Sequence, residues 1–536
     1  MAEGPISRKR KSSYLVNYRY SALGVFHLLG FEFGTGVAIP QYQDATFKLH
    51  FPDKKGSTSI FGLGGKSDIE LFQSEDDSDN AYGDDYEDLR YGTNTGVIGI
   101  TRTHKLGRYT KLKVVAAVNA ARTQTHLDTF ALDSGKIINY SGLYRDNSTQ
   151  GKYTFNATVE HKFNSKSSLR SGVRFHQYFF ELNDSVYNQD YGFWVEPTSF
   201  SGNTNLVQAF VNERYRINKR IKVNLGLSFS MYGLNNSMAL EPRFGLKYKV
   251  NSKYTISAGY GLHSLLPPFR IYFEEITDSL GNKRKINQDL GFMRSHHYAL
   301  AHDFSIGKNS RLKVETYYQH MFDVPVDGDG NVYYTLLNQG ADFGVNFTEN
   351  MQNNGMGRNY GLEITLERFM NKGFYFLNTL SLYRSQYTAL NDIRYPTVFD
   401  SRYALNLLGG KEFYFTEKTN KKGKTSKASM TADVKFVVNG GQRHTPVDVV
   451  ATEQQNEVVY VNSRTNELQY QEYARFDLRI AYKVQTKKMT QEWGIDIQNL
   501  TNRDNIFSTQ YDPETKEYRI TNQTGILPIG LYRITF

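Results

Sequence analysis

Apolar and polar residues alternate with a period of two along much of the chain. The clearest stretches are KVNLGLSFS (222–230), RFGLKYKV (243–250) and ARFDLRIAY (474–482). Because successive side chains of a strand point to opposite faces, each stretch predicts a strand with one apolar and one polar face. No long window shows helical periodicity, and the sequence has no apolar run long enough for a transmembrane helix.

The connections between these stretches also alternate, this time in length. Short polar turns occur at 52–57, 164–167, 218–220, 251–253, 308–310, 371–373 and 485–488. The other connections are mostly long, at roughly 69–93, 128–150, 186–203, 266–296, 326–358, 446–471 and 511–525. Short turns at one rim and long loops at the other are typical of outer-membrane barrels, where the turns are periplasmic and the loops extracellular.

Counting strands between these connections gives about 20 of them. We expect them to begin near residues 13, 45, 58, 95, 111, 152, 168, 205, 221, 239, 254, 297, 311, 359, 374, 402, 427, 473, 491 and 526. Strands with one apolar face can be covered in soluble sandwiches or propellers. However, the chain shows neither the linkers that several sandwiches need nor a blade repeat. The pattern therefore predicts an all-β fold, a transmembrane antiparallel β-barrel over 1–536 whose apolar face meets lipid.

Composition agrees with a barrel and excludes some chemistry. Aromatic residues make up 14% of the chain, while the mean hydropathy is −0.55. A barrel reads as polar on average because alternate residues face a wet lumen. The absence of cysteine excludes disulfides and thiolate chemistry. The opening residues contain no apolar signal segment, so we expect a processed chain or a fragment.

The charges behind the net charge of +10 differ between the short turns, the long loops and the lumen-facing positions. They do not form a continuous basic stripe of the kind that binds nucleic acid. The short turns are rich in Lys and Arg, one long loop is acidic at 75–88, and Lys and Arg at lumen-facing positions hold much of the remaining charge. Basic residues are not interleaved with aromatics along one surface. We therefore expect no nucleic-acid partner.

The C-terminal residues GLYRITF form a further alternating segment. Tyr532, Ile534 and Phe536 share its apolar face. A terminal aromatic residue with apolar residues two and four positions earlier is similar to the strand that the barrel-assembly machinery recognises. The alternative is an ordinary last strand that stops where the chain stops.

Several segments together resemble the TonB-dependent outer-membrane receptors of Bacteroidetes-type bacteria, in the group with a carboxypeptidase-regulatory-like domain. They are SYLVNYRYSALG (13–24), QYQDATFKLHFP (41–52), RSHHYAL (294–300), GRNYGLEITLERFMNKGFYF (357–376), LNLLGGKEF (405–413), EWGIDIQNLTNRDNIF (492–507) and LPIGLYRITF (527–536). The resemblance implies a 22-stranded barrel, an N-terminal plug and a TonB box. Because no plug-like stretch precedes Ser13 and the opening AEGPISRKRKS reads as the first periplasmic turn, we expect the plug and the first two strands to be absent.

The best ligand candidates are aromatic and basic residues in the predicted extracellular loops. They are Phe193, Trp194, Phe269, Arg270 and Tyr272. Aromatic rings can stack on sugars or chelate rings, and Arg can bind carboxylates. Ordinary loop packing, or a place at the membrane interface, is an equally good interpretation of the same residues.

Three other groups are better explained by structure than by a metal. The acidic loop 75–88 is interpreted as solvated surface. VDGDGNV (326–332) lacks the Gly and Glu of a calcium loop, so it predicts a tight turn. His296 and His297 are adjacent on a strand and should point to opposite faces. We expect no metal site and no cofactor.

The function implied by the resemblance is energised uptake of a scarce or bulky nutrient, such as a siderophore, haem, cobalamin, a peptide or a glycan. The expected partners are outer-membrane lipid and lipopolysaccharide, the barrel-assembly machinery, the TonB–ExbB–ExbD complex and the nutrient itself, in the cell outer membrane. The alternative is a passive porin-like channel, and a third hypothesis is a barrel enzyme or adhesin. No catalytic signature is present, so the sequence does not predict an enzyme.

Overall fold

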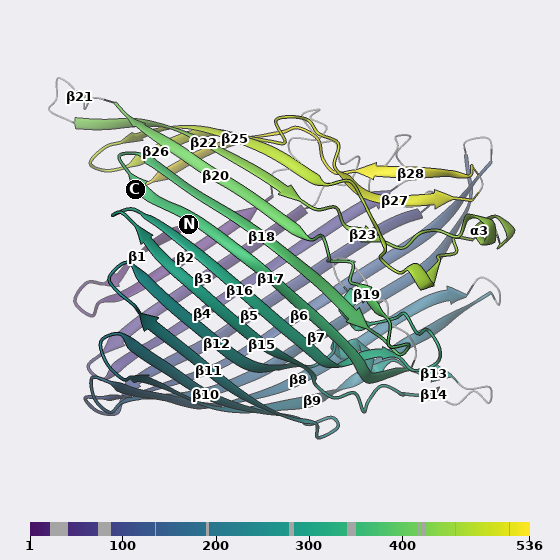
Figure 1. Ribbon diagram of the computed structural model, residues 1–536, viewed down its shortest axis with the longest axis horizontal. Coiled ribbons are helices and arrows are strands. Elements are labelled where there is room, and N and C mark those ends of the chain that lie inside the picture. Colours follow the sequence, from purple (N-terminus) through teal and green to yellow (C-terminus); the bar gives the residue numbers. More distant parts are fainter. Residues whose placement is uncertain are drawn as a thin grey trace.

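The protein is described from a computed structural model that is almost entirely β-sheet (Figure 1). The structure describes residues 1–21, 41–72, 87–133, 136–188, 192–277, 283–339, 350–415, 418–419, 425–455, 457–513 and 515–536. No helix in this part of the chain is long and apolar enough to cross a bilayer.

The strands of the main sheet follow one another along the chain as antiparallel neighbours. Its first half contains β1 (Ala2–Ser7), β2 (Ser12–Tyr20), β3 (Gln41–Asp53), β4 (Gly56–Phe72), β5 (Glu87–Lys105), β6 (Thr110–Asp133), β7 (Lys136–Lys162), β8 (Ser167–Asn188), β9 (Phe193–Arg216), β10 (Ile221–Tyr232) and β11 (Met238–Lys249). Its second half contains β12 (Tyr254–Leu265), β15 (Met293–Ile306), β16 (Ser310–Asp327), β17 (Met351–Asn371), β18 (Phe374–Thr388), β20 (Tyr403–Tyr414), β22 (Thr425–Asn439), β25 (Tyr473–Gln485), β26 (Thr490–Gln498) and β29 (Leu527–Thr535).

This sheet confirms the predicted fold class and all of the predicted strands. Among the described residues it has 23 strands, which include the short β19 (Arg394–Pro396) and β21 (Lys418–Thr419). The prediction was wrong at the start of the chain. The opening residues were interpreted as a turn, but β1 pairs with β2, and only residues 8–11 turn between them. Pro5 hid this strand in the sequence, yet an edge strand tolerates proline because one side of its backbone has no ladder to form.

The sheet curls into a barrel with an apolar outside. On β10, Leu225 is 51% exposed on the outer face, whereas Tyr232, which has the opposite parity, is completely buried inside. Directly paired residues of four neighbouring strands form an aromatic row on the outer face: Tyr260, Tyr298, Tyr318 and Tyr360. Such rows mark the interface between the hydrocarbon core and the headgroups of a membrane.

The two rims of the barrel differ as the sequence predicted. Tight turns such as 163–166 and 250–253 gather at the left of Figure 1, and the long connections gather at the right. Two long loops were predicted wrongly. Residues 128–133 and 136–150 are strand rather than loop, because β6 and β7 continue past the barrel wall as a paired extension. The predicted loop 186–203 is likewise mostly strand, because β8 reaches Asn188 and β9 begins at Phe193.

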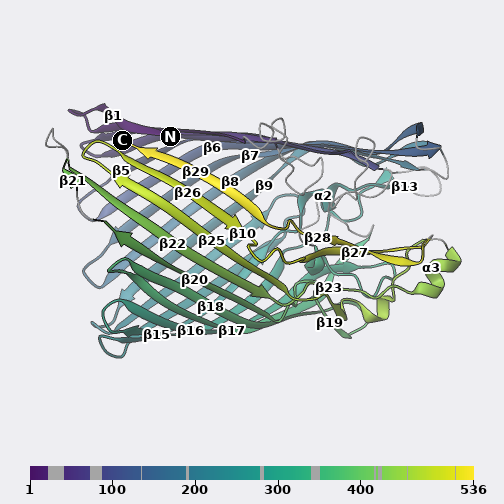
Figure 2. The ribbon, with the colours of Figure 1, turned by 90° about the horizontal axis from the view of Figure 1, so that it is seen from above.

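Shorter elements lie among the long connections. These are α2 (Phe269–Phe273), β13 (Ile276–Thr277), β14 (Lys283–Arg284), η2 (Leu336–Asn338), β23 (Arg443–His444), α3 (Val449–Gln455), η3 (Asn462–Arg464), β24 (Leu468–Gln469), β27 (Ile506–Asp512) and β28 (Glu517–Asn522). Most of them extend beyond the wall, as α3 and the β27–β28 hairpin do, but α2 is seen against the strands of the barrel (Figure 2). The long-loop rim is therefore partly covered from within.

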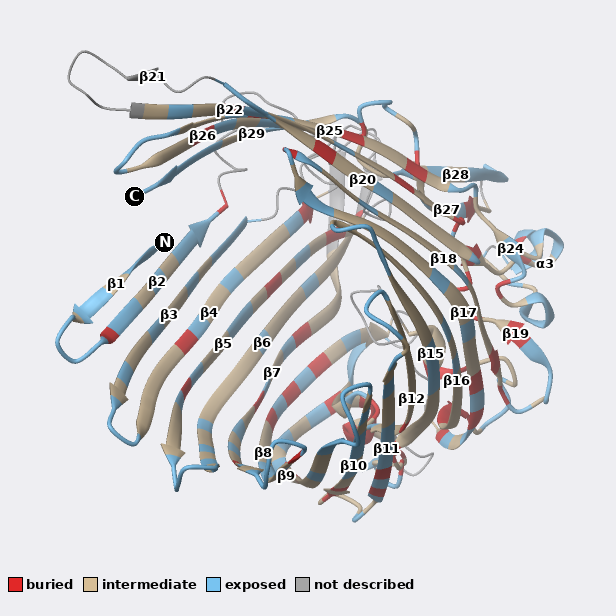
Figure 3. Cartoon of the chain, turned by 60° about the vertical axis from the view of Figure 1, so that its left-hand side comes forward, coloured by how far each residue is buried: buried red, intermediate tan, exposed pale blue. Residues whose placement is uncertain are grey.

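The first and last strands of the sheet face each other across a gap (Figure 3). Within the described residues, β1 pairs only with β2, and β29 pairs only with β26. Buried residues concentrate at the opposite side, around the long-loop rim of β8 to β18. The best-packed part of the molecule is thus the end where the predicted ligand residues lie.

Candidate functional site

The segment that contains three of the predicted ligand residues folds into the barrel as α2. Its short helix begins after Pro268, whose fixed φ of −51° suits the residue before a first turn. Tyr272 lies on Tyr232 of the inner wall, with 5.3 Å between the ring centroids. Burial raises the pKa of the Tyr272 hydroxyl well above its usual range. Three residues of α2 have no exposed surface: Ile271, Tyr272 and Phe273.

Stacked rings attach α2 to the inner faces of β8 and β9. Phe273 lies parallel to Phe200 at a centroid distance of 3.9 Å and an interplanar angle of 8°. Phe180 contacts the same ring at 5.1 Å, and Phe269 contacts Tyr178 at 4.6 Å. Aromatic pairs of this kind add to the free energy gained by burial. The aromatic residues of α2 therefore serve first to hold the segment on the wall.

Arg270 compensates two buried carboxylates at the same place. Its guanidinium forms an ion pair with Asp184 and lies 4.0 Å from Asp146. It also donates to the hydroxyl of Tyr144 at 3.1 Å. Asp184 further accepts the backbone N–H of Thr198 at 2.7 Å. An ion pair with this much hydrogen bonding can persist in a site that is largely closed to water.

The rest of the 266–292 connection is tied to neighbouring loops by buried amides. Asn235 donates to the carbonyl of Leu290 at 2.7 Å, and the side chain of Asn287 accepts the N–H of Met351 at 2.9 Å. These bonds satisfy backbone groups that would otherwise be buried without partners. Residues 287–290 of the connection are therefore fixed to the neighbouring loops.

The other two predicted ligand residues lie at the open rim. Phe193 is 54% exposed and Trp194 is 41% exposed, at the beginning of β9. Trp194 meets Tyr187 edge-on at 5.5 Å, and the guanidinium of Arg145 lies 5.7 Å from its ring centre. Arg145 follows Tyr144, the hydroxyl partner of Arg270 in α2. The structure thus connects the rim tryptophan to α2 through two neighbouring residues of β7.

Burial separates the five predicted ligand residues into two groups. Phe193 and Trp194 are accessible to a molecule that arrives from outside. Arg270 is engaged with carboxylates, and Tyr272 has no exposed surface. Sequence reasoning missed Asp184, whose only signal was an acidic residue at a lumen-facing position of β8.

A second buried ion cluster organises the loops after β18 and β22. The Asp400 carboxylate accepts from Arg384 at 3.1 Å and from the N–H of Ser385 at 2.8 Å, and it lies 3.2 Å from Arg443 in an ion pair. Arg443 also donates to the backbone carbonyl of Asp400 at 2.8 Å. Burial lowers the pKa of Arg443, although Asp400 opposes that shift. Arg443 then bridges to the carbonyl of Asn466 at 3.1 Å. This cluster joins loops that are distant in the sequence. Its charged side chains already have partners within the protein.

The acidic loop 75–88 and the segment 326–332, considered above as possible metal ligands, show no metal-binding geometry where they are described. The acidic loop falls outside the described residues, apart from Glu87 and Asp88. Asp327 accepts the backbone N–H groups of Asp329 and Gly330 at 2.6 and 3.0 Å, which is the geometry of a tight turn. Across the described part of the chain, no group of three or more His, Asp or Glu side chains is arranged to hold a metal ion.

The two adjacent histidines point to opposite faces of β15. His296 is hydrogen-bonded to Tyr260 at 3.1 Å, in line with the outer tyrosine row. The ring of His297 lies 4.5 Å from that of His263 on the inner face. The two imidazoles therefore do not chelate a common ion.

The C-terminal segment forms β29, with Tyr532 directly opposite Trp493 of β26. Tyr532 and Ile534 lie on the outer face, and Phe536 is 91% exposed beyond the strand. Recognition of this strand by the barrel-assembly machinery stays a prediction.

These features define a class: a large antiparallel membrane barrel with short turns at one rim and a lumen partly covered from the other. Residues 32–500 match the family described as TonB dependent receptor-like, beta-barrel. The chain belongs to this family, whose members are receptors and transporters. No protein among the curated ones matches the chain.

Solved structures of similar fold are receptors of this kind. The ferric-catecholate import receptor Fiu from Escherichia coli K12 is 10% identical, with a TM-score of 0.67 over 99% of this chain and 79% of that one. The ferripyoverdine receptor of the Pseudomonas aeruginosa outer membrane is 11% identical, with a TM-score of 0.69 over 99% of this chain and 69% of that one. The siderophore receptor PirA from Acinetobacter baumannii is 14% identical, with a TM-score of 0.61 over 99% and 76%. At these identities the likeness shows the fold.

Proposed function

We propose that this chain is the barrel of a TonB-dependent receptor that takes up a scarce or bulky nutrient across the outer membrane. Family membership over residues 32–500 carries the proposal. The inward position of α2 supports it, because a segment fixed inside the lumen narrows the path that a passive channel would keep open. The porin-like alternative is accordingly not favoured.

The nutrient classes open to such a receptor are siderophores, haem, cobalamin, peptides and glycans. Receptors for ferric siderophores are prominent among proteins of this fold. We favour a ferric siderophore for that reason, with first contact at Phe193 and Trp194. Phe269, Arg270 and Tyr272 then act by holding the surface beneath the ligand in place.

The partners follow from this role. TonB with ExbB and ExbD would supply energy through a TonB box and plug. The barrel-assembly machinery would recognise the strand ending in Phe536, and lipid and lipopolysaccharide would cover the outer tyrosine row. Removal of Phe536 should then lower the amount of barrel in the outer membrane.

The test is growth of a deletion strain on single iron and carbon sources, followed by uptake of the one source that fails. Replacing Phe193 and Trp194 with Ala together should reduce uptake about tenfold while leaving the amount of receptor unchanged. Leu240→Ala, on the outer face of β11, is the matched control and should leave uptake unchanged. Growth that is normal on every source contradicts the proposal, and uptake that persists without TonB supports a passive channel.

A further inference from the structure

A row of nitrogen-bearing side chains crosses the outer face of three neighbouring strands, β15, β16 and β17. His296 lies directly opposite His320, and His320 lies directly opposite Arg358. Each of them stands two residues from a member of the outer tyrosine row, on the side of the long loops. Two residues of a strand span about 7 Å, so this row lies just above the tyrosines, at the level of the headgroups of the outer leaflet. We call His296, His320 and Arg358 the outer basic row.

Each member of the outer basic row keeps a donor for a ligand. Tyr260 is hydrogen-bonded to Nδ1 of His296 at 3.1 Å, which leaves Nε2 of that ring for another partner. His320 forms no hydrogen bond within the described part of the chain. Arg358 donates from Nε and Nη2 to Oε1 of Gln386 at 2.9 and 2.7 Å, and Nη1 remains. Because glutamine is neutral, it orients the guanidinium without cancelling its charge.

Ring contacts hold the row in a fixed arrangement. The imidazoles of His296 and His320 are nearly parallel, at 6° with 6.5 Å between their centroids. Phe322 stacks against both rings, at 5.2 Å from His296 and 6.1 Å from His320. The guanidinium of Arg358 lies 5.7 Å from the ring centre of Tyr360. A ligand would therefore meet donors whose positions are already set.

The carboxylates of the same three strands do not compensate the row. Asp323 follows Phe322 but forms an ion pair with Arg294 at 3.4 Å. Asp303, Glu315, Glu363 and Glu367 have the parity of inner residues. No member of the row forms an ion pair with another described residue. A cation on the membrane-facing surface without a protein partner is best satisfied by an anionic headgroup.

From this arrangement we propose that the outer basic row binds a phosphate group of lipopolysaccharide in the outer leaflet. Arg358 binds phosphate by a charge-assisted hydrogen bond, and the two imidazoles add N–H donors. In the row below the tyrosines, Leu300 and Leu362 lie on either side of Thr316, where they can contact acyl chains. One molecule that carries both phosphate and acyl chains therefore matches the surface. The inference rests on the outer-membrane location in the proposed function, but it does not depend on the nutrient.

The test is binding of purified rough lipopolysaccharide to the purified chain in a nonionic detergent, measured by native mass spectrometry. The combined variant His296→Gln, His320→Gln and Arg358→Gln should lower the bound fraction about tenfold or more. Lipopolysaccharide from which the phosphates have been removed should bind to the unaltered chain about tenfold more weakly as well. Raising the salt concentration should weaken binding of the phosphorylated form.

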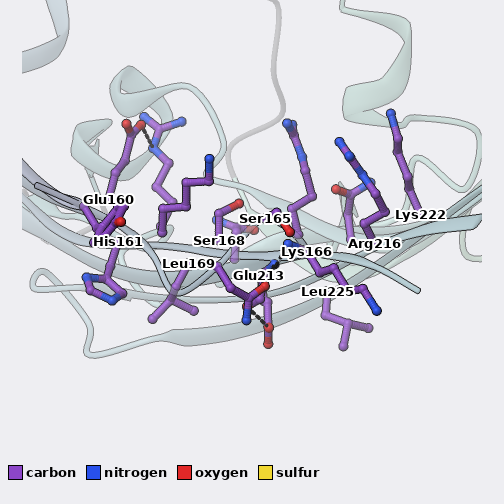
Figure 4. Close-up of a pocket in the computed structure, with 18 of the residues that line it drawn as sticks. Glu160, His161, Ser165, Lys166, Ser168, Leu169, Glu213, Arg216, Lys222 and Leu225 are labelled. Carbon is purple, nitrogen blue, oxygen red and sulfur yellow. Dashed lines mark hydrogen bonds and ion pairs between the residues drawn. The ribbon is translucent and has the colours of Figure 1, made fainter. Parts of the chain in front are cut away.

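The matched control removes the same three side-chain types from the outer face near the rim of the short turns, the turn rim. Its substitutions are Arg102→Gln, His104→Gln and His161→Gln. On β5, Arg102 and His104 have the parity of Ile100, which is exposed on the outer face. Figure 4 shows His161 pointing to the same side of the wall as Leu225, another outer residue.

The control should leave lipopolysaccharide binding within about twofold of the original, because Arg102 already forms an ion pair with Asp53. Heat-modifiable gel migration verifies that each variant is folded. Equal loss in the control, unchanged binding in the row variant, or equal binding of the dephosphorylated lipid overturns the proposal. Row-dependent binding of inorganic phosphate without retention of the lipid overturns the assignment to lipopolysaccharide. Loss of lipid binding by the unaltered chain alongside normal nutrient uptake would contradict this inference alone.

Discussion

The inner faces of β8 to β11 differ between the two rims of the barrel. At the long-loop rim they carry aromatic side chains, are covered by α2, and have their buried carboxylates compensated by Arg270. At the turn rim they carry long, exposed cations, and Arg216, Lys222 and Lys247 face one another across β9, β10 and β11 without an ion pair among the described residues. The same alternation of side chains along the same strands thus produces a packed region and an open charged region.

The difference shows what alternation does and does not decide. Parity places a side chain inside or outside the barrel, but it does not determine whether an inside residue is packed or hydrated. A segment can cover an inner face that carries aromatic rings and short acidic side chains. The rings stack on rings of the segment, and a buried acid can pair with one of its cations. A row of like charges cannot be covered by an apolar segment without a large desolvation cost. Loss of one side chain should therefore have opposite consequences at the two rims.

The largest effect should follow from removing the ring at the centre of α2. Phe273→Ala deletes a ring with no exposed surface that stacks on Phe200, and we expect about 3–5 kcal/mol of lost stability for the covering segment. Hydrogen exchange of residues 266–277 should show the loss as faster exchange. Phe193→Ala, at an exposed position, is the control and should stay within about 0.5 kcal/mol. Unchanged protection in the Phe273 variant would mean that α2 does not rest on the wall as described.

Removing the charge of Arg270 should have the next largest effect. Arg270→Ala leaves Asp184 and Asp146 buried beside it without their cation, at a cost on the order of 3 kcal/mol. Limited proteolysis should then cut the 266–292 connection. The double variant Arg270→Ala with Asp184→Ala should be less destabilised than the sum of the two single variants, because one of the two unpaired acids is gone. Strict additivity would show that the two side chains are not coupled.

Much of the barrel could be predicted because each strand carries its own pattern. All twenty predicted strands form, and the two rims separate as the turn lengths indicated. β1 was missed because Pro5 interrupts the short segment AEGPIS, and its pairing comes from the backbone of β2. The 128–150 segment was taken for a loop because a ladder outside the membrane needs no apolar face.

The covered lumen could not be predicted from the local sequence. The run FRIYF (269–273) is too short to show a period, and its partners Phe200 and Asp184 lie about 70 to 90 residues earlier. The sequence identified Phe269, Arg270 and Tyr272 as chemically notable but could not show that they face the wall. The cations of the turn rim were expected inside the lumen. Which of them lie opposite one another depends on the register between strands, and that register cannot be read from the sequence.

At the turn rim the loss of a charge should stabilise the barrel. Lys222→Gln removes repulsion from both Arg216 and Lys247, and we expect a gain of about 0.2–1 kcal/mol in the free energy of unfolding. Denaturant unfolding in detergent at low salt measures this gain, which should shrink as salt screens the charges. Lys308→Gln, in a turn with no opposed cation, should leave stability unchanged. A destabilised Lys222 variant would contradict the opposite behaviour of the two rims.

The smallest effect at neutral pH should come from Tyr272→Phe. The Tyr272 hydroxyl is buried without a hydrogen-bond partner among the described residues, so its removal should change stability by less than about 0.5 kcal/mol at pH 8. Burial raises the pKa of Tyr272, so the folded state keeps the proton. An unfolded tyrosine ionises near pH 10, so the stability that depends on the neutral hydroxyl is complete below about pH 10 and falls above it.

The near-ultraviolet circular dichroism signal, followed as the pH is raised into the alkaline range, should therefore distinguish this variant from the unaltered chain. Tyr272→Phe should keep its aromatic signal to higher pH, because the ring at that position no longer has a proton to lose. Tyr518→Phe, at an exposed position on β28, should leave the alkaline transition where it is. If both variants shift the transition equally, burial in α2 is not what protects the neutral hydroxyl, and the packed rim would have to be more open to water than its rings indicate.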